Sequence, residues 1–368
     1  MNLDTHSAPT HTISAPPTLT AVRRVIPRGL FERDDRKAWS FLSRNLLGLV
    51  LCQLTALLAW THSLWWLYPL CWLVAGTFLF GLFEVAHNCG HHAFFSSKRT
   101  NKVVGHLAAL PLLYPFTQWK LWHDAHHRRP NSTAQTLREQ FQGNMSLKLD
   151  TAFSPLNVQD ALTAQHKGGL SWLVYRVSRR LVPIAVFLAP LLLTILFARR
   201  LRPQEQRDCR ISLLFSCGVT LPLMASIVIL SHSWFALVHF WLAPLAVYAS
   251  WLGCYSFLQH TGEDIPVYDD HEWTNLAQIH AVVNTTIPTW LSWIHGGGEF
   301  HAIHHIAPTL PSYHLAAAHQ ALQNSPYASL IRSVPLSLKS FWKLQRTCEV
   351  WDASTSTYRS ISSLKSVE

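Results

Sequence analysis

Long runs of apolar residues restrict what this chain can fold into more than any other feature of its sequence. Charged residues make up 14% of its 368 residues, well below the roughly 25% of ordinary soluble domains. Four apolar runs approach the length of a transmembrane helix, and they lie at about residues 45–62, 64–86, 211–230 and 235–258. Only short turns separate the first two runs and the last two. We therefore predict an all-α membrane protein whose four transmembrane helices form two hairpins.

Two further apolar segments are expected to enter the membrane without crossing it. Residues 103–116 are too few to span a bilayer. Residues 181–198 contain Pro183 and Pro190 and have arginines on both flanks, and a proline inside a helix removes a hydrogen bond. The sequence therefore predicts interfacial or re-entrant helices at both places.

Basic residues determine the expected orientation and domain organisation. Lysines and arginines concentrate at residues 23–44, before the first run, and such residues favour the cytoplasmic side. We expect a disordered, basic cytoplasmic segment at 1–40, a membrane domain at 41–325 and a cytoplasmic tail at 326–368. Because the net charge of +10 comes from sequences beside the spans, no nucleic-acid partner is expected. The seven dispersed cysteines contain no CxxC pair and indicate a reducing compartment rather than a disulfide framework.

Histidines gather in three tight clusters next to these apolar runs. The clusters are His-Asn-Cys-Gly-His at 87–91 followed by His92, His-Asp-Ala-His-His at 123–127, and His-Ala-Ile-His-His at 301–305. Side chains three or four residues apart share one face of a helix, so each cluster can direct several imidazoles at one point. Neutral imidazole is the commonest protein ligand for transition metals. Since the clusters hold too many imidazoles for one ion, we infer two metal ions on the cytoplasmic side, where a four-span topology places all three clusters.

With the clusters placed, the chain resembles the integral-membrane fatty acid desaturases. It is most similar to the bacterial and cyanobacterial acyl-lipid desaturases that act at Δ12 or nearby positions. The matching stretches, spread over roughly residues 40–325, are 87–91, 104–116, Trp-His-Asp-Ala-His-His at 122–127, Gln-His-Thr at 259–261, and 301–313 with its Ala-Pro-Thr-Leu-Pro-Ser-Tyr ending. The chain departs from the family pattern at Asn88, where an acidic residue is usual, at Ala125, where many members have histidine, and in the glycines at 296–298.

The resemblance implies a non-haem di-iron centre and a set of ligands for it. The implied ligands are His87, His91, His123, His126, His127, His301, His304 and His305, with His260 as a ninth. Residues beside metal ligands commonly orient the imidazole rings. The candidates for that role are His92, Asp124, Glu84 and Glu299.

The resemblance also implies a reaction. A membrane desaturase uses O2 to introduce a cis double bond into a fatty acyl chain, and the resemblance implies Δ12-type acyl-lipid desaturation here. Breaking an unactivated C–H bond is chemistry that belongs to a cofactor. The chain has no His-Pro-Gly-Gly haem box and no iron–sulfur cysteine pattern. Electrons are therefore expected from a separate ferredoxin or cytochrome b5-like carrier. The expected location is a bacterial inner membrane or a thylakoid-type membrane.

Two other functions fit parts of this pattern. The same scaffold serves fatty acyl hydroxylases, acetylenases and epoxygenases and carotenoid ketolases and hydroxylases, which share hydrogen abstraction and differ in the fate of the radical. A membrane metal transporter would need ionisable residues inside its spans. The apolar runs of this chain are nearly free of charge, which disfavours a transporter.

Overall fold

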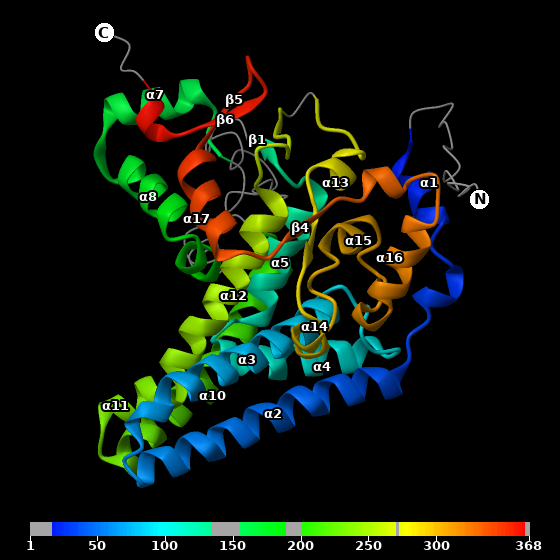
Figure 1. Cartoon of the computed structure of the whole chain (residues 1–368). Coiled ribbons are helices and arrows are strands. Elements are labelled where there is room, and N and C mark those ends of the chain that lie inside the picture. Colours follow the sequence, from blue (N-terminus) through cyan, green and yellow to red (C-terminus); the bar gives the residue numbers. More distant parts are fainter. Residues whose placement is uncertain (1–16, 134–154, 189–200, 270–271, 365–368) are drawn as a thin grey trace, which may run out of the picture.

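A computed structural model describes residues 17–133, 155–188, 201–269 and 272–364 of the chain, and these residues are mostly helical (Figure 1). Four helical stretches are long and apolar enough to cross a membrane: Asp35–Thr61, Trp65–Gly90, Pro203–Ser231 and Trp234–His260. They comprise α2 (Asp35–Thr61), η2 (Trp65–Leu67) with α3 (Tyr68–Gly90), α10 (Pro203–Ser231), and α11 (Trp234–Leu237), η5 (Val238–Leu242) and α12 (Ala243–His260). The prediction of four helices with the length and composition of spans is thereby confirmed.

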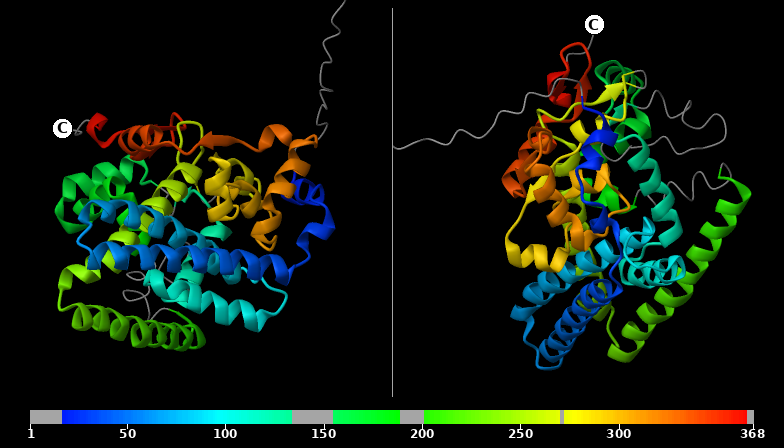
Figure 2. Two further views of the ribbon diagram at one scale, coloured as in Figure 1. Left: turned by 60° about the horizontal axis from the view of Figure 1, so that its bottom comes forward. Right: turned by 90° about the vertical axis from the view of Figure 1, so that its right-hand side faces the viewer.

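Glycines let the long helices approach one another closely. A Cβ atom placed on Gly76 of α3 would lie 2.4 Å from Cβ of Val247 on α12, and one on Gly48 of α2 would lie 2.3 Å from the ring of Phe78. Small residues at such contacts allow helix backbones to pack tightly where lipid surrounds them. Helix α10 stands apart from α2, α3 and α12 (Figure 2). It exposes Leu214, Leu221 and Leu230.

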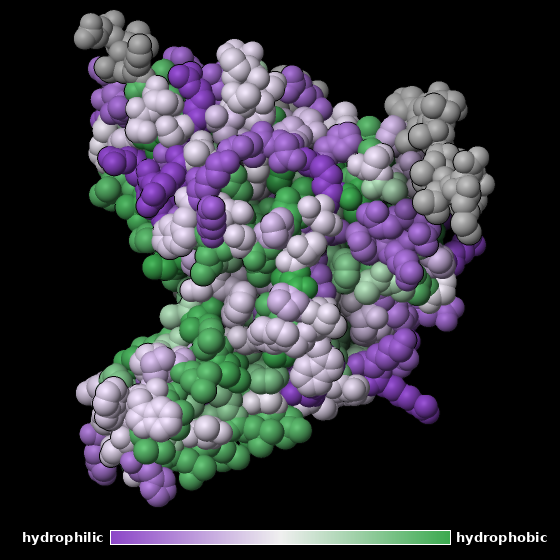
Figure 3. All heavy atoms as spheres, viewed as in Figure 1, coloured by the Kyte–Doolittle hydropathy of each residue, from purple (hydrophilic) through white to green (hydrophobic). Residues whose placement is uncertain are grey.

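Apolar side chains cover the part of the molecule formed by the long helices, while the opposite part is more polar (Figure 3). Exposed tryptophans occur near both ends of these helices. Trp65 and Trp234 lie at the two turns between long helices, whereas Trp39 lies in the first turns of α2 and Trp293 lies on α14 (Thr289–His295). The guanidinium of Arg44 lies 4.1 Å from the ring of Trp293, so α14 lies beside the beginning of α2.

Shorter helices cover the ends of α3 and α12. They are α4 (Lys98–Ala109), η3 (Leu110–Leu112), α5 (Phe116–Arg128), α13 (Ala277–His280), α14, α15 (His301–Ile306), η6 (Ser312–His314) and α16 (Leu315–Gln323). The predicted membrane-immersed segment 103–116 forms the second half of α4, η3 and the turn before α5, with Val103 and Leu107 exposed and Val104 and Ala108 buried. Of the other predicted segment, 181–198, residues 189–198 lie outside the described part of the chain.

Short strands join segments that are distant in sequence. Strand β1 (Ser132–Thr133) pairs in parallel with β2 (Tyr268–Asp269), and β3 (Asn284–Thr286) pairs in parallel with β4 (Ser333–Pro335). Strands β5 (Val350–Asp352) and β6 (Thr357–Arg359) form an antiparallel pair. The remaining elements near the C-terminus are η7 (Ala328–Leu330), which contacts α16, and α17 (Leu338–Thr347) and η8 (Ile361–Ser363), which lie near α7 (Val158–Lys167) and α8 (Gly169–Arg180). Beyond residue 326 the described chain therefore packs on the rest of the protein, as when Tyr175 donates a hydrogen bond to the carbonyl of Glu349.

The N-terminal segment is ordered where the structure describes it. Residues 1–16 lie outside the described part, but α1 (Leu19–Arg24) and η1 (Arg28–Phe31) precede α2. Val22 and Ile26 are buried in a cluster that includes Ile303 and Ile306 of α15. The expectation of disorder is therefore wrong for residues 17–40, because apolar residues among the arginines supply a face that α15 covers.

Candidate metal centre

Nine histidines converge in two adjacent groups on the side of the molecule where α3 and α12 end. His87, His91, His123, His127 and His304 form the first group, and His126, His260, His301 and His305 form the second. Within each group one ring nitrogen of every histidine lies within 4.8 Å of those of the others, so each group could hold a metal ion. The groups contain all nine histidines to which the sequence assigned a ligand role.

Helix geometry directs the first cluster to one group and divides the second and third clusters between the two groups. His87 lies in the last turn of α3 and His91 caps that helix, so both reach the first group. Helix α5 directs His123 and His127 to the first group and His126 to the second. Residues four apart on a helix face the same way, whereas a residue three apart is rotated toward a neighbouring direction.

The third cluster is divided in the same manner. His301 and His305, four residues apart at the two ends of α15, point into the second group, and His304 points into the first. His260 is the last residue of α12, and its Nε2 lies 2.9 Å from Nε2 of His301. The histidine that ends the last long helix therefore completes the second group.

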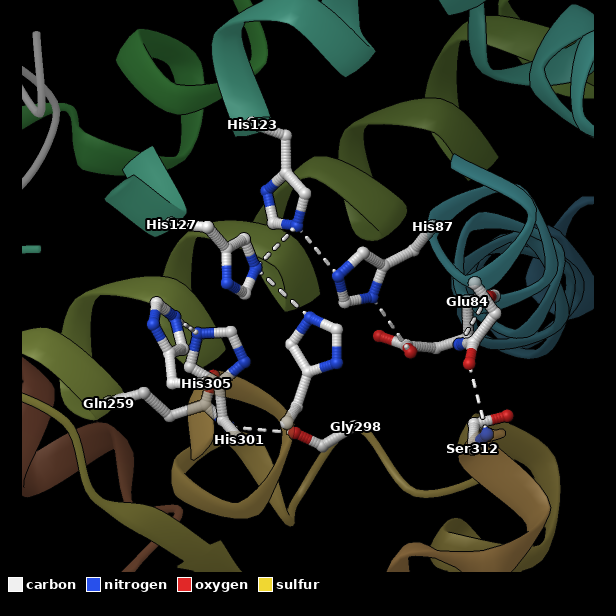
Figure 4. Close-up of polar contacts among 11 residues, drawn as sticks. Glu84, His87, His123, His127, Gln259, Gly298, His301, His305 and Ser312 are labelled. Atoms are coloured by element: carbon white, nitrogen blue, oxygen red, sulfur yellow. Dashed lines mark hydrogen bonds and ion pairs between the residues drawn. The ribbon is translucent and has the colours of Figure 1, made fainter. Parts of the chain in front are cut away.

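The spacing of the nitrogen atoms fits coordination of a metal ion. Nε2 of His123 lies 2.8 Å from Nε2 of His87 and 3.0 Å from Nε2 of His127, and Figure 4 shows these rings converging from α3 and α5. In the second group, Nε2 of His305 lies 3.2 Å from Nε2 of both His126 and His301. An imidazole nitrogen binds zinc at about 2.1 Å, so ligands at right angles on such an ion have nitrogens about 3.0 Å apart. The imidazoles present therefore fit two first-row metal ions.

Burial favours the neutral form of several of these imidazoles, which is the form that binds metals. Outside the long helices, burial lowers the pKa of six histidines well below its usual value, and neighbouring imidazoles lower it further. These histidines are His91, His123, His127, His301, His304 and His305. Nε2 of His91 is buried without a hydrogen-bond partner among the described residues. A metal ion would give that nitrogen a partner.

Among the four proposed orienting residues, Glu84 is the only one whose side chain pairs with a histidine of either group in the described part of the chain. Its Oε2 lies 3.3 Å from Nδ1 of His87 (Figure 4). Glu299 is buried but accepts a hydrogen bond from the hydroxyl of Ser292. Asp124 pairs with Lys120 at 2.5 Å. His92 is exposed and belongs to neither group, so the expectation that it orients a ligand finds no support.

Gln278 contacts the centre although nothing in the sequence pattern singled it out. Its Oε1 lies 3.3 Å from Nδ1 of His305, and its Nε2 donates to the carbonyl of His127 at 2.5 Å. The residue lies on the four-residue helix α13, far in sequence from both contacts. No spacing rule connects a lone glutamine to a histidine 27 positions later, so only the folded arrangement identifies it.

The glycines before the third cluster allow a close approach to α2 and α3. Gly296 has a φ of 62°, and a Cβ there would lie 2.1 Å from the ring of Phe41. A Cβ on Gly298 would lie 3.0 Å from Oε1 of Glu84. Asn88 adds a link, because its Oδ1 accepts a hydrogen bond from the backbone N–H of Ser312 at 3.0 Å. These contacts hold α15 against the end of α3.

A narrow cavity of about 40 Å³ reaches histidines of both groups. His87 and His123 of the first group and His126, His260 and His301 of the second lie on its wall. The remaining wall is largely apolar and aromatic, with Phe80, Phe83, Tyr114, Trp119, Leu252 and Tyr255. The ring of Trp119 also stacks on His123, with ring centroids 4.7 Å apart. A small apolar group in this cavity would meet histidines of both groups.

Comparison with known proteins agrees with this geometry. A family model described as fatty acid desaturase matches residues 63–333. The chloroplastic omega-6 fatty acid desaturase of Glycine max is 28% identical over 337 residues, which cover 91% of this chain and 74% of that protein. The sn-1 oleoyl-lipid 12-desaturase of Synechocystis is 27% identical over 356 residues, covering 95% of this chain and 93% of the relative. A protein of the same name from Picosynechococcus is 28% identical over 341 residues. The resemblance inferred from the histidine clusters is thus confirmed, and this chain, a membrane oxidoreductase, belongs to the fatty acid desaturase family.

Proposed function

We propose that the nine histidines hold two iron ions and that the protein uses O2 to introduce a cis double bond into a fatty acyl chain of a membrane lipid, at the Δ12 position. The observation that carries this proposal is the convergence of two histidine groups on one apolar cavity. The position is supported by the relatives named omega-6 fatty acid desaturase and sn-1 oleoyl-lipid 12-desaturase. The ligand set is the nine histidines named above, with Glu84 orienting His87.

The iron pair would supply the O2 activation that removes hydrogen from an unactivated methylene. In the overall reaction the acyl chain loses two hydrogen atoms, two electrons and two protons enter, and O2 becomes two molecules of water. The protein residues position the chain and exclude water. Aromatic side chains such as Phe83, Trp119 and Tyr255 line the path to the histidines, and a dry site limits side reactions.

For topology we propose two helical hairpins, with α2 and α3 in the first and α10 and α12 in the second. The N-terminus and the histidine groups face the cytoplasm. Exposed tryptophans support two interfacial levels, because Trp65 and Trp234 lie at the far turns and Trp39 and Trp293 lie near the other end, as aromatic belts do. Residues 103–116 are proposed to enter the membrane without crossing. Residues 41–325 would then form the catalytic domain and 326–368 a cytoplasmic tail, in a bacterial inner or thylakoid-type membrane.

Electrons are proposed to come from a separate ferredoxin or cytochrome b5-like protein. The support is the composition of the chain, which has no cluster-binding cysteine pattern or haem box and carries a net charge of +10. A positive surface attracts an acidic partner.

The test is expression of the full chain in a host whose lipids contain oleoyl chains and no more highly unsaturated ones. Mass spectrometry of the extracted lipids should reveal a second double bond at Δ12. His304→Ala should abolish this product without preventing membrane insertion, whereas His62→Ala, at the exposed turn between α2 and α3, should leave it unchanged. A double bond at another carbon would correct the position, and a hydroxylated product or no product would contradict desaturation.

A further inference from the structure

We propose that Gln278 is a positioning residue that fixes the orientation and tautomer of His305 and joins the two histidine groups. The inference rests on the proposed ligand set and concerns a residue outside it. Gln278 is 8% exposed and lies between the backbone of His127 and the ring of His305. Among the histidines, His127 points into the first group and His305 into the second.

The orientation of the Gln278 amide follows from its partner on α5. The carbonyl oxygen of His127 can only accept a hydrogen bond. The end of the Gln278 amide that lies 2.5 Å from that oxygen must therefore be the nitrogen, Nε2. This leaves Oε1 of the same amide facing Nδ1 of His305 at 3.3 Å.

The tautomer of His305 follows from the amide. Oε1 of Gln278 can only accept, so Nδ1 of His305 carries the hydrogen, and the neutral ring then has its lone pair on Nε2. That Nε2 faces the Nε2 atoms of His126 and His301, both 3.2 Å away. Without the amide, Nδ1 of His305 would lose the acceptor that holds the ring in its metal-binding tautomer. Residues in such a position typically contribute about 10–100-fold to metal affinity.

A second buried glutamine offers a matched control. Gln345 is 3% exposed, and its Nε2 donates to the carbonyl of Arg180 at 2.8 Å. It therefore shares burial and a backbone acceptor with Gln278, but it does not contact either histidine group. Replacing each glutamine by leucine removes the same chemical group, and only Gln278→Leu removes a partner of an imidazole.

The experiment uses the full chain, purified in lipid nanodiscs, stripped of metal and loaded with iron-57 in the ferrous state. Iron per chain, the rate of iron loss to a chelator and the Mössbauer spectrum are measured. Gln278→Leu should weaken one of two irons by about 10–100-fold and alter one of two iron environments, whereas Gln345→Leu should match the parent protein. Gln278→Glu retains an acceptor for Nδ1 of His305 and should hold the second iron better than Gln278→Leu does.

The outcomes separate this inference from the proposed function. Two irons held with parental affinity in Gln278→Leu, or equal weakening of both irons, would overturn the role of Gln278. Fewer than two irons in the parent protein would instead overturn the proposed centre. If Gln278→Leu does not fold, Gln278→Glu decides: retention of both irons supports the inference, and selective loss of one contradicts it.

Discussion

His127 and His305 stack face to face, with ring centroids 4.1 Å apart and ring planes inclined by 20°, although each ring belongs to a different histidine group. The two groups are therefore in direct contact through these two imidazoles. The stacked pair lies at the boundary between the two groups.

Removing the acceptor that Glu84 offers to His87 should weaken iron binding at the first group. Glu84→Leu loses the oxygen next to Nδ1 of His87, and loss of such a partner typically costs about 10–100-fold in metal affinity. Glu349→Leu is the control, because Glu349 is also buried but bonds to the N–H of Ile361. Equal iron affinities for the two variants, measured by competition with a chelator, would contradict the role of Glu84.

Filling the cavity should stop the reaction while leaving the histidines in place. Leu252→Phe adds bulk to the apolar wall that faces the histidines, so the double-bond product should fall at least tenfold as iron content stays at the parental level. Leu221→Phe places the same ring on an exposed site of α10 and should have no effect. Full activity of Leu252→Phe would show that the acyl chain enters by another route.

A side chain at Gly76 should separate α3 from α12. The Cβ of Gly76→Ala would overlap Val247, and overpacking of this kind costs about 1–3 kcal/mol. Gly218→Ala on α10 meets nothing within 4 Å and should be neutral or stabilising by up to about 1 kcal/mol. Thermal unfolding of the two variants in the same lipid measures the difference, and a transition temperature of Gly76→Ala at or above that of Gly218→Ala would refute the close contact.

The metal-free protein should lose stability in mild acid. Burial lowers the pKa of His123, His127 and His305 well below 6.5 in the folded protein, whereas the unfolded chain takes up protons near pH 6.5. The unfolded state therefore binds more protons below that pH, and each such histidine costs roughly 1.4 kcal/mol of stability per pH unit. The transition temperature of chelator-treated protein should fall between pH 7.5 and 5.5, and a flat profile would mean that these imidazoles are protonated when folded.

Turnover with the electron donor should weaken as salt rises. The net charge of +10 favours an acidic donor, and salt screens attraction between exposed charges over about 10 Å at 0.1 M. The apparent KM for reduced ferredoxin should therefore increase with ionic strength. Turnover with an uncharged chemical reductant is the control and should change little, and a constant KM for ferredoxin would exclude electrostatic docking.

The sequence predicted the components of the centre better than their arrangement. Apolar runs were enough to predict the four long helices, and cluster spacing was enough to predict eight of the nine histidines, because both follow from local periodicity. His260 stands outside the clusters, and only the family resemblance implied it. The division of the second and third clusters between the two groups required the fold: pairs four residues apart, such as His301 and His305, stay together, while His126 and His304 belong to the other group. The Gln278 contact depends on segments far apart in the chain, and no local pattern encodes it. The order of residues 17–40 was missed because the basic residues obscured the apolar face around Val22.

Each histidine group contains members from both halves of the chain. His304 completes a group otherwise built from residues 87–127, and His126 belongs with His260, His301 and His305. Strand β3, just before the third cluster, pairs with β4 at residues 333–335. During synthesis neither group can therefore be complete until the third cluster has left the ribosome. A product truncated before residue 301 would carry some of the imidazoles but no complete metal site.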